Sequence, residues 1–184
     1  MRKIIVSNLV SLDGFFEGVN KELDWHTVDE SFFEYARQLL NDVDTILFGR
    51  ITYQMMAAFW PNAIDEDAVI THKMNHLPKI VFSKTLKKVE WNNAKLVKGN
   101  LSKEVKSLKE QPGKDIVIFG SGTLVTQLTG LGLIDEYRVI INPLLLGKGN
   151  PMFKGIDDKI YLKLLKTKTL DTGVVILYYE PIKK

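Results

Sequence analysis

Short apolar runs rich in β-branched residues alternate along this chain with amphipathic segments. The apolar runs are typical of buried strands. They lie at Lys3–Val10, Asp44–Phe48, Lys79–Phe82, Ala94–Val97, Asp115–Phe119 and Glu136–Asn142. Between them, apolar residues recur at helical spacing. These segments predict helices at Glu30–Asn41, Arg50–Phe59, Glu66–His76, Leu101–Glu110 and Thr123–Leu131.

The pattern changes near the end of the chain. Two apolar segments, Ile160–Leu170 and Val174–Glu180, flank the turn sequence Asp171-Thr172-Gly173 and predict an antiparallel hairpin. Strands that alternate with helices predict a parallel sheet with helices on both faces. The fold class is therefore expected to be α/β, with a mainly parallel central sheet and an antiparallel C-terminal hairpin. The glycine-containing segment Ser11–Lys21 is expected to be a loop.

The composition suits a single domain over residues 1–184. Of these residues 45% are hydrophobic, which is enough for a sizeable core. The net charge is +3, and the 25 basic residues are scattered, so neither a nucleic acid nor a membrane is expected as a partner. The chain has no cysteine and no apolar run long enough to span a membrane. Because no secretion signal is recognisable, we expect a cytoplasmic protein.

Three of the predicted strands, those that end at Phe48, Phe82 and Phe119, run directly into polar turns. Each turn offers a backbone bend and a hydroxyl group, and two of them add a cation, Arg50 or Lys84. The carboxyl ends of parallel strands share one edge of a sheet, where ligands of α/β proteins bind. We therefore expect the three turns to surround one ligand. The alternative is that they are ordinary helix caps and loops.

The third turn, Gly120-Ser121-Gly122, leads straight into a predicted helix. Free backbone N–H groups and the positive end of the helix dipole can face an anion there. The turn is not a Rossmann fingerprint, because Val125 holds the third glycine position, and it is not a P-loop. A nucleotide phosphate is the expected anion. A turn that needs glycine only for its dihedral angles is the alternative.

The other two turns favour a cofactor with a 2′-phosphate. NAD sites usually place an acid on the ribose, whereas Arg50, Ser83 and Lys84 suit a phosphate and no acid lies in these turns. We therefore favour NADPH as the cofactor over NADH. The predicted cofactor-binding residues are Gly49, Arg50, Thr52, Ser83, Lys84, Gly120, Ser121, Gly122, Thr123 and Leu124.

The order and spacing of several motifs resemble the dihydrofolate reductase-like superfamily. The motifs are Ser11-Leu12-Asp13-Gly14, Gly49-Arg50-Ile51-Thr52-Tyr53, the turn at Gly120–Leu124 and the segment Gly132–Phe153. Within the superfamily the chain is most similar to the reductase domain of bacterial riboflavin biosynthesis, 5-amino-6-(5-phosphoribosylamino)uracil reductase, and its stand-alone relatives. The similarity extends from Lys3 to Tyr179.

This resemblance implies a three-layer α/β sandwich and an NADPH-dependent reductase that is often a homodimer. It also implies that the pyrophosphate lies on the Gly120–Leu124 turn. The 2′-phosphate or the adenosine would lie near Arg50, Ser83 and Lys84.

One segment departs from the riboflavin reductase pattern, in which Trp-Ile-Thr precedes basic residues that hold the ribose phosphate of the substrate. Here Trp25-His26-Thr27 precedes Asp29 and Glu30, whose charges would repel a phosphate. Arg37 is the only cation on the predicted helix that follows. We therefore expect a different heterocycle or a carbonyl compound as substrate.

Asp13 is the predicted catalytic residue, because the resemblance implies a functional acid there. In an apolar cleft its pKa could be raised, so that it donates a proton or binds a heterocyclic N–H group. The alternative is that Asp13-Gly14 is simply a turn. Trp25, Phe16 and Tyr53 are predicted to contact the substrate, with core packing as the alternative for Trp25 and Tyr53.

His72 and His76 share a predicted helix face, but two histidines do not complete a metal site, and we expect no metal. The leading hypothesis is an NADPH-dependent reductase of a small heterocyclic or carbonyl compound. The alternative is a non-catalytic nucleotide-binding module that kept the cofactor pocket.

Overall fold

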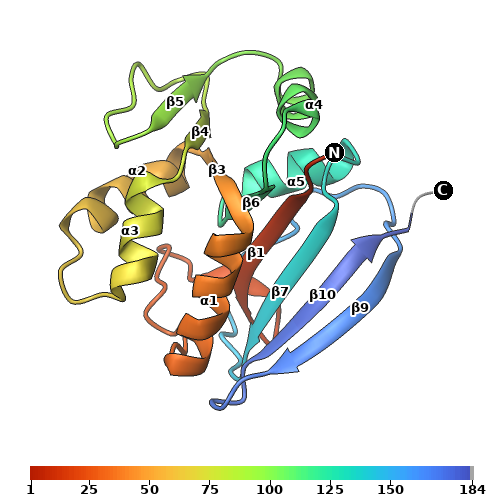
Figure 1. Ribbon diagram of the computed structural model, residues 1–184. Coiled ribbons are helices and arrows are strands. Elements are labelled where there is room, and N and C mark those ends of the chain that lie inside the picture. The colour runs from red at the N-terminus through yellow and green to blue at the C-terminus, as the bar shows by residue number, and fades with distance from the viewer. Residues whose placement is uncertain (183–184) are drawn as a thin grey trace.

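The computed structural model describes residues 1–182. Its main feature is an eight-stranded sheet in the order β5-β4-β3-β6-β1-β7-β10-β9 (Figure 1). Neighbouring strands from β5 to β7 are parallel, whereas β10 runs antiparallel to both β7 and β9. The predicted parallel sheet with an antiparallel C-terminal hairpin is therefore confirmed.

The elements have the following bounds. The sheet consists of β1 (Ile4–Ser11), β3 (Val43–Gly49), β4 (Lys79–Phe82), β5 (Ala94–Val97), β6 (Asp115–Phe119), β7 (Glu136–Asn142), β9 (Leu162–Thr169) and β10 (Val175–Pro181). A separate two-stranded sheet consists of β2 (Phe15–Glu17) and β8 (Asn150–Pro151). The helices are α1 (Glu30–Asp42), α2 (Arg50–Phe59), the 3-10 turn η1 (Trp60–Asn62), α3 (Ala68–His76), α4 (Leu101–Glu110) and α5 (Gly122–Gly130).

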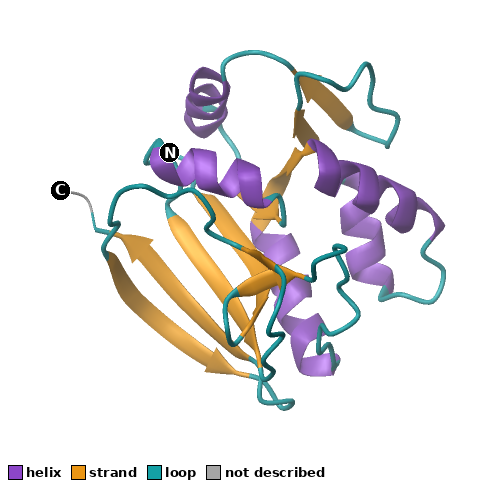
Figure 2. Cartoon of the chain, turned by 180° about the vertical axis from the view of Figure 1, so that it is seen from behind, coloured by secondary structure: helices purple, strands orange, loops and turns teal. Residues whose placement is uncertain are grey.

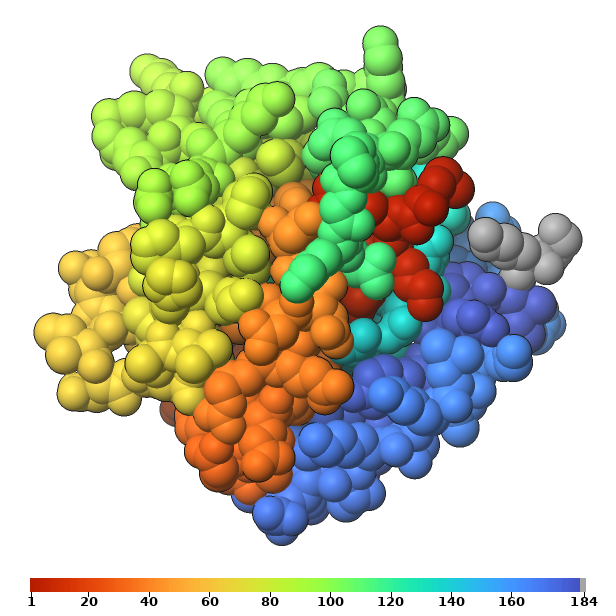
Figure 3. All heavy atoms as spheres, in the orientation of Figure 1, coloured from red at the N-terminus to blue at the C-terminus, as the bar shows by residue number. Residues whose placement is uncertain are grey.

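Helices cover both faces of the main sheet, which makes the fold a three-layer α/β sandwich (Figure 2). α1, α2 and α3 contribute to one core, and α4 and α5 to the other. Strand β3 shows the alternation: Ile46 and Phe48 lie in the first core and Leu47 in the second, and all three are fully buried. A strand buried on both faces is a continuous apolar run, which is why the sequence pattern was readable here. In the space-filling view the C-terminal hairpin (blue) lies beside α1 (orange) (Figure 3).

The predicted bounds of most elements agree with the structure to within two residues. The expected loop Ser11–Lys21 is different, because it contains β2, which pairs antiparallel with β8. Strands of three and two residues are too short to show a periodic pattern. Only their pairing in the folded chain makes them strands.

Candidate functional site

The carboxyl ends of β3, β4 and β6 open into one cleft of about 820 Å³, a size that suits a small molecule or a cofactor. Its walls are the turns after these strands, the first turns of α5, and parts of β2 and β8. The predicted convergence of the three turns is therefore confirmed. Apart from Gly120, all the predicted cofactor-binding residues line the cleft: Gly49, Arg50, Thr52, Ser83, Lys84, Ser121, Gly122, Thr123 and Leu124.

Hydrogen bonds join the turn after β6 to the turn after β3. The Ser121 backbone N–H donates to Thr52 Oγ1 over 2.9 Å, and the Gly49 N–H donates to Ser121 Oγ over 2.8 Å. Asn8 of β1 accepts the Gly120 N–H over 2.7 Å through Oδ1. The hydroxyl oxygens of Thr52 and Ser121 thus hold the shape of the turn. Asn8 was not predicted, although a polar residue in the middle of an apolar strand is a readable signal.

The turn after β6 needs an unusual backbone. Gly120 and Ser121 have φ angles of 62° and 58°, both in the left-handed region. A Cβ atom on Gly120 would also lie 3.0 Å from Thr52 Cγ2, so glycine is required for space as well as for conformation. The two hydrogen bonds of Ser121 stabilise its strained conformation. The bend places the N-terminus of α5, which begins at Gly122, in the lining of the cleft.

Two helices, α2 and α5, begin at this cleft, and neither has a side-chain cap within residues 1–182. By contrast, Asp29, Asp67 and Asn100 cap the N-termini of α1, α3 and α4. An uncapped N-terminus presents backbone N–H groups and the positive end of the helix dipole. The cleft therefore combines two features that suit an anion.

Four cationic side chains line the cleft, those of Arg50, Lys84, Lys98 and Lys154, whereas Glu17 is the only acid among the lining residues. None of the four forms an ion pair with any residue that the structure describes. Lys98 and Lys154 were not predicted. Lys98 follows β5 as Lys84 follows β4, so the same strand-end argument applied to a fourth strand could have found it.

The structure corrects the interpretation of Asp13. Its carboxylate accepts the backbone N–H groups of Leu146 over 3.0 Å and Gly147 over 2.8 Å, which ties the β1–β2 turn to the loop after β7. Hydrogen bonds from the Ser11 side chain and these two backbone groups lower the pKa of Asp13 to about 2. The predicted raised pKa is therefore wrong. Asp13 is ionised at neutral pH and is not one of the residues that line the cleft.

Of the three predicted substrate contacts, only Phe16 lines the cleft. Its ring lies against the start of α5, because a Cβ atom on Gly122 would be 3.0 Å from Phe16 Cζ. Tyr53 is 5% exposed and belongs to the core, where its hydroxyl oxygen accepts the Trp91 N–H over 3.1 Å. Trp25 is half-buried in the loop before α1, outside the lining of the cleft.

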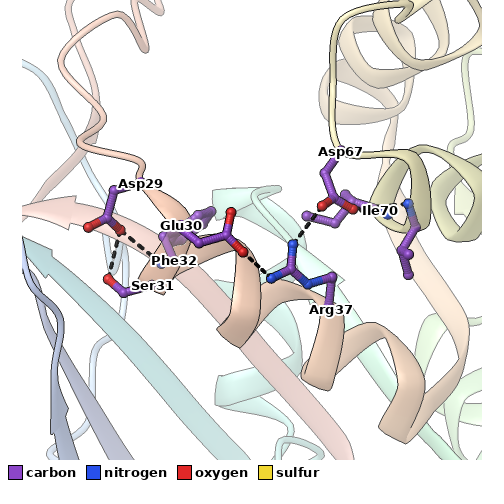
Figure 4. Close-up of polar contacts among 8 residues, drawn as sticks. Asp29, Glu30, Ser31, Phe32, Arg37, Asp67 and Ile70 are labelled. Atoms are coloured by element: carbon purple, nitrogen blue, oxygen red, sulfur yellow. Dashed lines mark hydrogen bonds and ion pairs between the residues drawn. The ribbon is translucent and has the colours of Figure 1, made fainter.

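The charged side chains at the start of α1 are engaged within the protein (Figure 4). Arg37 donates to Asp67 Oδ2 over 2.6 Å and forms an ion pair with Glu30. Asp29 Oδ1 accepts the Phe32 N–H over 2.9 Å and so caps the helix. The single cation of α1 is therefore already paired within the protein.

Solved structures place the fold among the dihydrofolate reductase-like reductases. A Shewanella sp. PV-4 protein, provisionally assigned to riboflavin biosynthesis, has a TM-score of 0.78 at 25% identity, over 98% of this chain and 99% of that one. Dihydrofolate reductase from Enterococcus faecalis, solved with NADP(H), has a TM-score of 0.65 at 13% identity, over 98% and 97% of the chains. The second likeness shows a shared fold.

The family is defined by sequence. The model of the RibD C-terminal domain matches residues 2–176, and the chain belongs to this family. Two uncharacterized proteins of Bacillus subtilis (strain 168) are similar over nearly their whole length. YyaP is 38% identical over 181 residues, which cover 97% of this chain and 95% of YyaP. YwjB is 26% identical over 181 residues, which cover 96% of this chain and 97% of YwjB.

Proposed function

We propose that this protein is an NADPH-dependent reductase that acts on a small heterocyclic or carbonyl compound. One observation supports the proposal above all others. In a single cleft, the uncapped N-termini of α2 and α5 lie beside Arg50, Lys84, Lys98 and Lys154, four cations that no described residue neutralises. Membership of a reductase family supports the reaction class.

The lining residues fit a phosphorylated dinucleotide. The backbone N–H groups at Gly122 and Thr123, at the start of α5, would hold the pyrophosphate. Arg50 and Lys84, with Lys98 beside them, would hold the 2′-phosphate, since a guanidinium can bind a phosphate through two parallel hydrogen bonds.

The chemistry that NADPH supplies when bound is a hydride from its nicotinamide ring. The protein's own task is to orient that ring and to exclude water. Phe16 and the buried Met152 form an apolar part of the cleft wall beside the start of α5, where they would keep water away. Asp13 holds the loop after β7 and so positions the segment that leads into β8.

The proposal is tested by binding and by turnover. Isothermal titration calorimetry should give an affinity for NADPH about tenfold or more above that for NADH, because only NADPH carries the phosphate that the cations would bind. The absorbance of NADPH should then fall in the presence of at least one neutral carbonyl or heterocyclic compound from a panel. Equal affinity for both dinucleotides, or none for either, would contradict the proposal.

A non-catalytic nucleotide-binding module is the second candidate, and the placement of Asp13 favours it. The predicted proton donor is ionised, engaged with backbone N–H groups and outside the lining of the cleft. Such a module would bind NADPH as tightly as an enzyme. It would oxidise no NADPH with any compound of the panel.

A second copy of the chain is the proposed partner, and the cytoplasm is the proposed location. The edge strand β9 offers a surface for the partner, because Leu162, Leu164 and Leu165 are between 39% and 49% exposed. Sedimentation velocity would decide between monomer and dimer. Separately, no helix within residues 1–182 is long and apolar enough to cross a membrane.

A further inference from the structure

The cleft uses only part of the sheet edge at which ligands are expected. It lies at the ends of β3, β4 and β6, whereas the carboxyl ends of β1 and β7 lie outside its lining. The loop before α1 lies over these two ends. The Thr27 N–H donates to Asn142 Oδ1 over 2.8 Å, and Asn142 at the end of β7 pairs in register with Ser11 at the end of β1.

This loop carries a polar atom with no partner. His26 Nε2 is buried and makes no hydrogen bond with any residue that the structure describes. The imidazole ring meets the Trp25 indole at an angle of 84°, with the ring centres 4.4 Å apart. Because a buried polar atom without a hydrogen bond is costly, such atoms in folded proteins need an explanation. A ligand that completes the site is one.

His26 is held in its neutral form. Burial lowers the pKa of His26 to about 4, so its imidazole carries no charge at neutral pH. A neutral imidazole offers a donor on one nitrogen and an acceptor on the other. It can therefore form a hydrogen bond with an uncharged C=O, C=N or N–H group, but it cannot balance the charge of a phosphate.

The chain segment that carries His26 is acidic. Arg37 is paired with both Asp67 and Glu30 (Figure 4). In the segment from Gly18 to Glu34, Lys21 is the single cation, and it is exposed. The acids of that segment are Glu22, Asp24, Asp29, Glu30 and Glu34. The net negative charge of the segment would repel a phosphorylated compound.

We propose that His26 Nε2 is a hydrogen-bonding contact for the substrate, and that this substrate is an uncharged heterocycle or carbonyl compound bound over the ends of β1 and β7, next to Trp25. The proposal rests on the proposed function, because it takes the bound compound to be the substrate of a reductase. It adds a residue that determines specificity, and it agrees with the expectation that the substrate carries no phosphate group. Asn142 acts as a positioning residue, because it holds the loop at Thr27.

The test uses lumazine, a fluorescent and uncharged pteridinedione, titrated onto the protein saturated with NADP⁺. We expect saturable quenching of its fluorescence. His26→Leu should weaken lumazine binding about tenfold or more, because the hydrogen bond is lost. His26→Gln retains a hydrogen-bonding group and should stay within about threefold of the unsubstituted protein. Uridine should displace lumazine at least as well as uridine 5′-monophosphate, which adds only the phosphate.

The matched control is His72→Leu, on α3, whose ring stacks on His76. It should leave lumazine binding unchanged, and thermal melting would verify that each variant is folded. The proposal is overturned if lumazine does not bind, if His26→Leu and His72→Leu bind it equally, or if uridine 5′-monophosphate displaces it better than uridine. Failure of NADP⁺ to bind would instead contradict the proposed function. In that case the same lumazine titrations without NADP⁺ would still decide the role of His26.

Discussion

The N-termini of α1 and α5 show two different uses of the same structural feature. At α1, Asp29 accepts the Phe32 N–H over 2.9 Å, so the protein satisfies the helix with its own carboxylate. At α5, the residue in the same position is Ser121, whose side chain accepts the Gly49 N–H instead and leaves the helix uncapped. The first helix end is neutralised, and the second is free for a ligand.

The difference shows that a helix N-terminus is open to an external anion where no side chain of the protein caps it. Asp67 does for α3 what Asp29 does for α1, and it also pairs with Arg37 (Figure 4). In the cleft, the described residues include no side chain that caps α2 or α5 and no acid that forms an ion pair with the four cations. A candidate anion-binding site is thus recognised by helix N-termini without a side-chain cap and by cations that form no ion pair.

Giving α5 an acidic N-cap should remove the difference between the N-termini of α1 and α5. Ser121→Asp keeps an oxygen acceptor for the Gly49 N–H, and aspartate tolerates the left-handed backbone of Ser121. The new carboxylate would occupy the anion site, so we expect the affinity for NADPH to fall about 100-fold, or about 2.8 kcal/mol. Calorimetry checks this, with Ser107→Asp on the exposed face of α4 as the control. Unchanged NADPH binding in Ser121→Asp would show that α5 holds no phosphate.

Removing a cation should have a smaller and more selective effect. Arg50→Ala should weaken NADPH about tenfold and NADH by less than about twofold, because only NADPH has a 2′-phosphate for the guanidinium. The same titrations with Lys95→Ala, an exposed lysine of β5 outside the cleft lining, should show no change. Equal losses for both dinucleotides would remove Arg50 from this role.

Breaking a capped helix should affect stability and not binding. Asp67→Ala removes the cap of α3 and one partner of Arg37, so we expect the free energy of unfolding to fall by about 1 kcal/mol. Glu30→Ala breaks only an exposed ion pair and should cost less. Urea denaturation of both variants measures the difference. Weaker NADPH binding in Asp67→Ala would mean that the two regions are coupled.

Substitution of Asp13 should have the smallest effect, a change in thermal stability that depends on pH. Its folded pKa of about 2 lies below the usual 3.8, so its ionised form stabilises the fold above the usual pKa, and this stabilisation is lost as the pH falls through about 2. The melting temperature of Asp13→Asn should therefore lie below that of the unsubstituted protein by a constant amount at neutral pH. The gap should close as the pH approaches 2. A gap that widens in acid would contradict the lowered pKa.

How much of the site was predictable depended on the range of the contacts. The turns at Gly49, Ser83 and Gly120 were found because each directly follows an apolar strand, and a parallel sheet brings such ends together. The role of Asp13 could not be found, because its partners, Leu146 and Gly147, lie more than 130 residues further along the chain. In the sequence, Asp13-Gly14 shows only that the chain turns.

The predicted substrate contacts likewise depended on packing that the sequence does not show. Tyr53 and Trp25 were predicted to contact the substrate because they are aromatic residues in or near the motifs of the family resemblance. Aromatic residues, however, fill cores as readily as they bind ligands. Only the packing separates the two uses, since Tyr53 is buried beside Trp91 whereas Trp25 remains half-exposed beside His26. The missing partner of His26 Nε2 is likewise visible only when every neighbour is in place.

The amino-acid sequence by itself determined the order of strands and helices, the parallel sheet and the edge at which the cleft lies, because these follow from local periodicity and from glycine and hydroxyl residues at strand ends. The tertiary structure alone decided which charged groups are free and which are paired. Arg37 and Arg50 are both arginines of helices, but among residues 1–182 the fold brings acids against Arg37 and none into an ion pair with Arg50. Charge is a property of a residue, whereas its availability depends on neighbours that are distant in the chain.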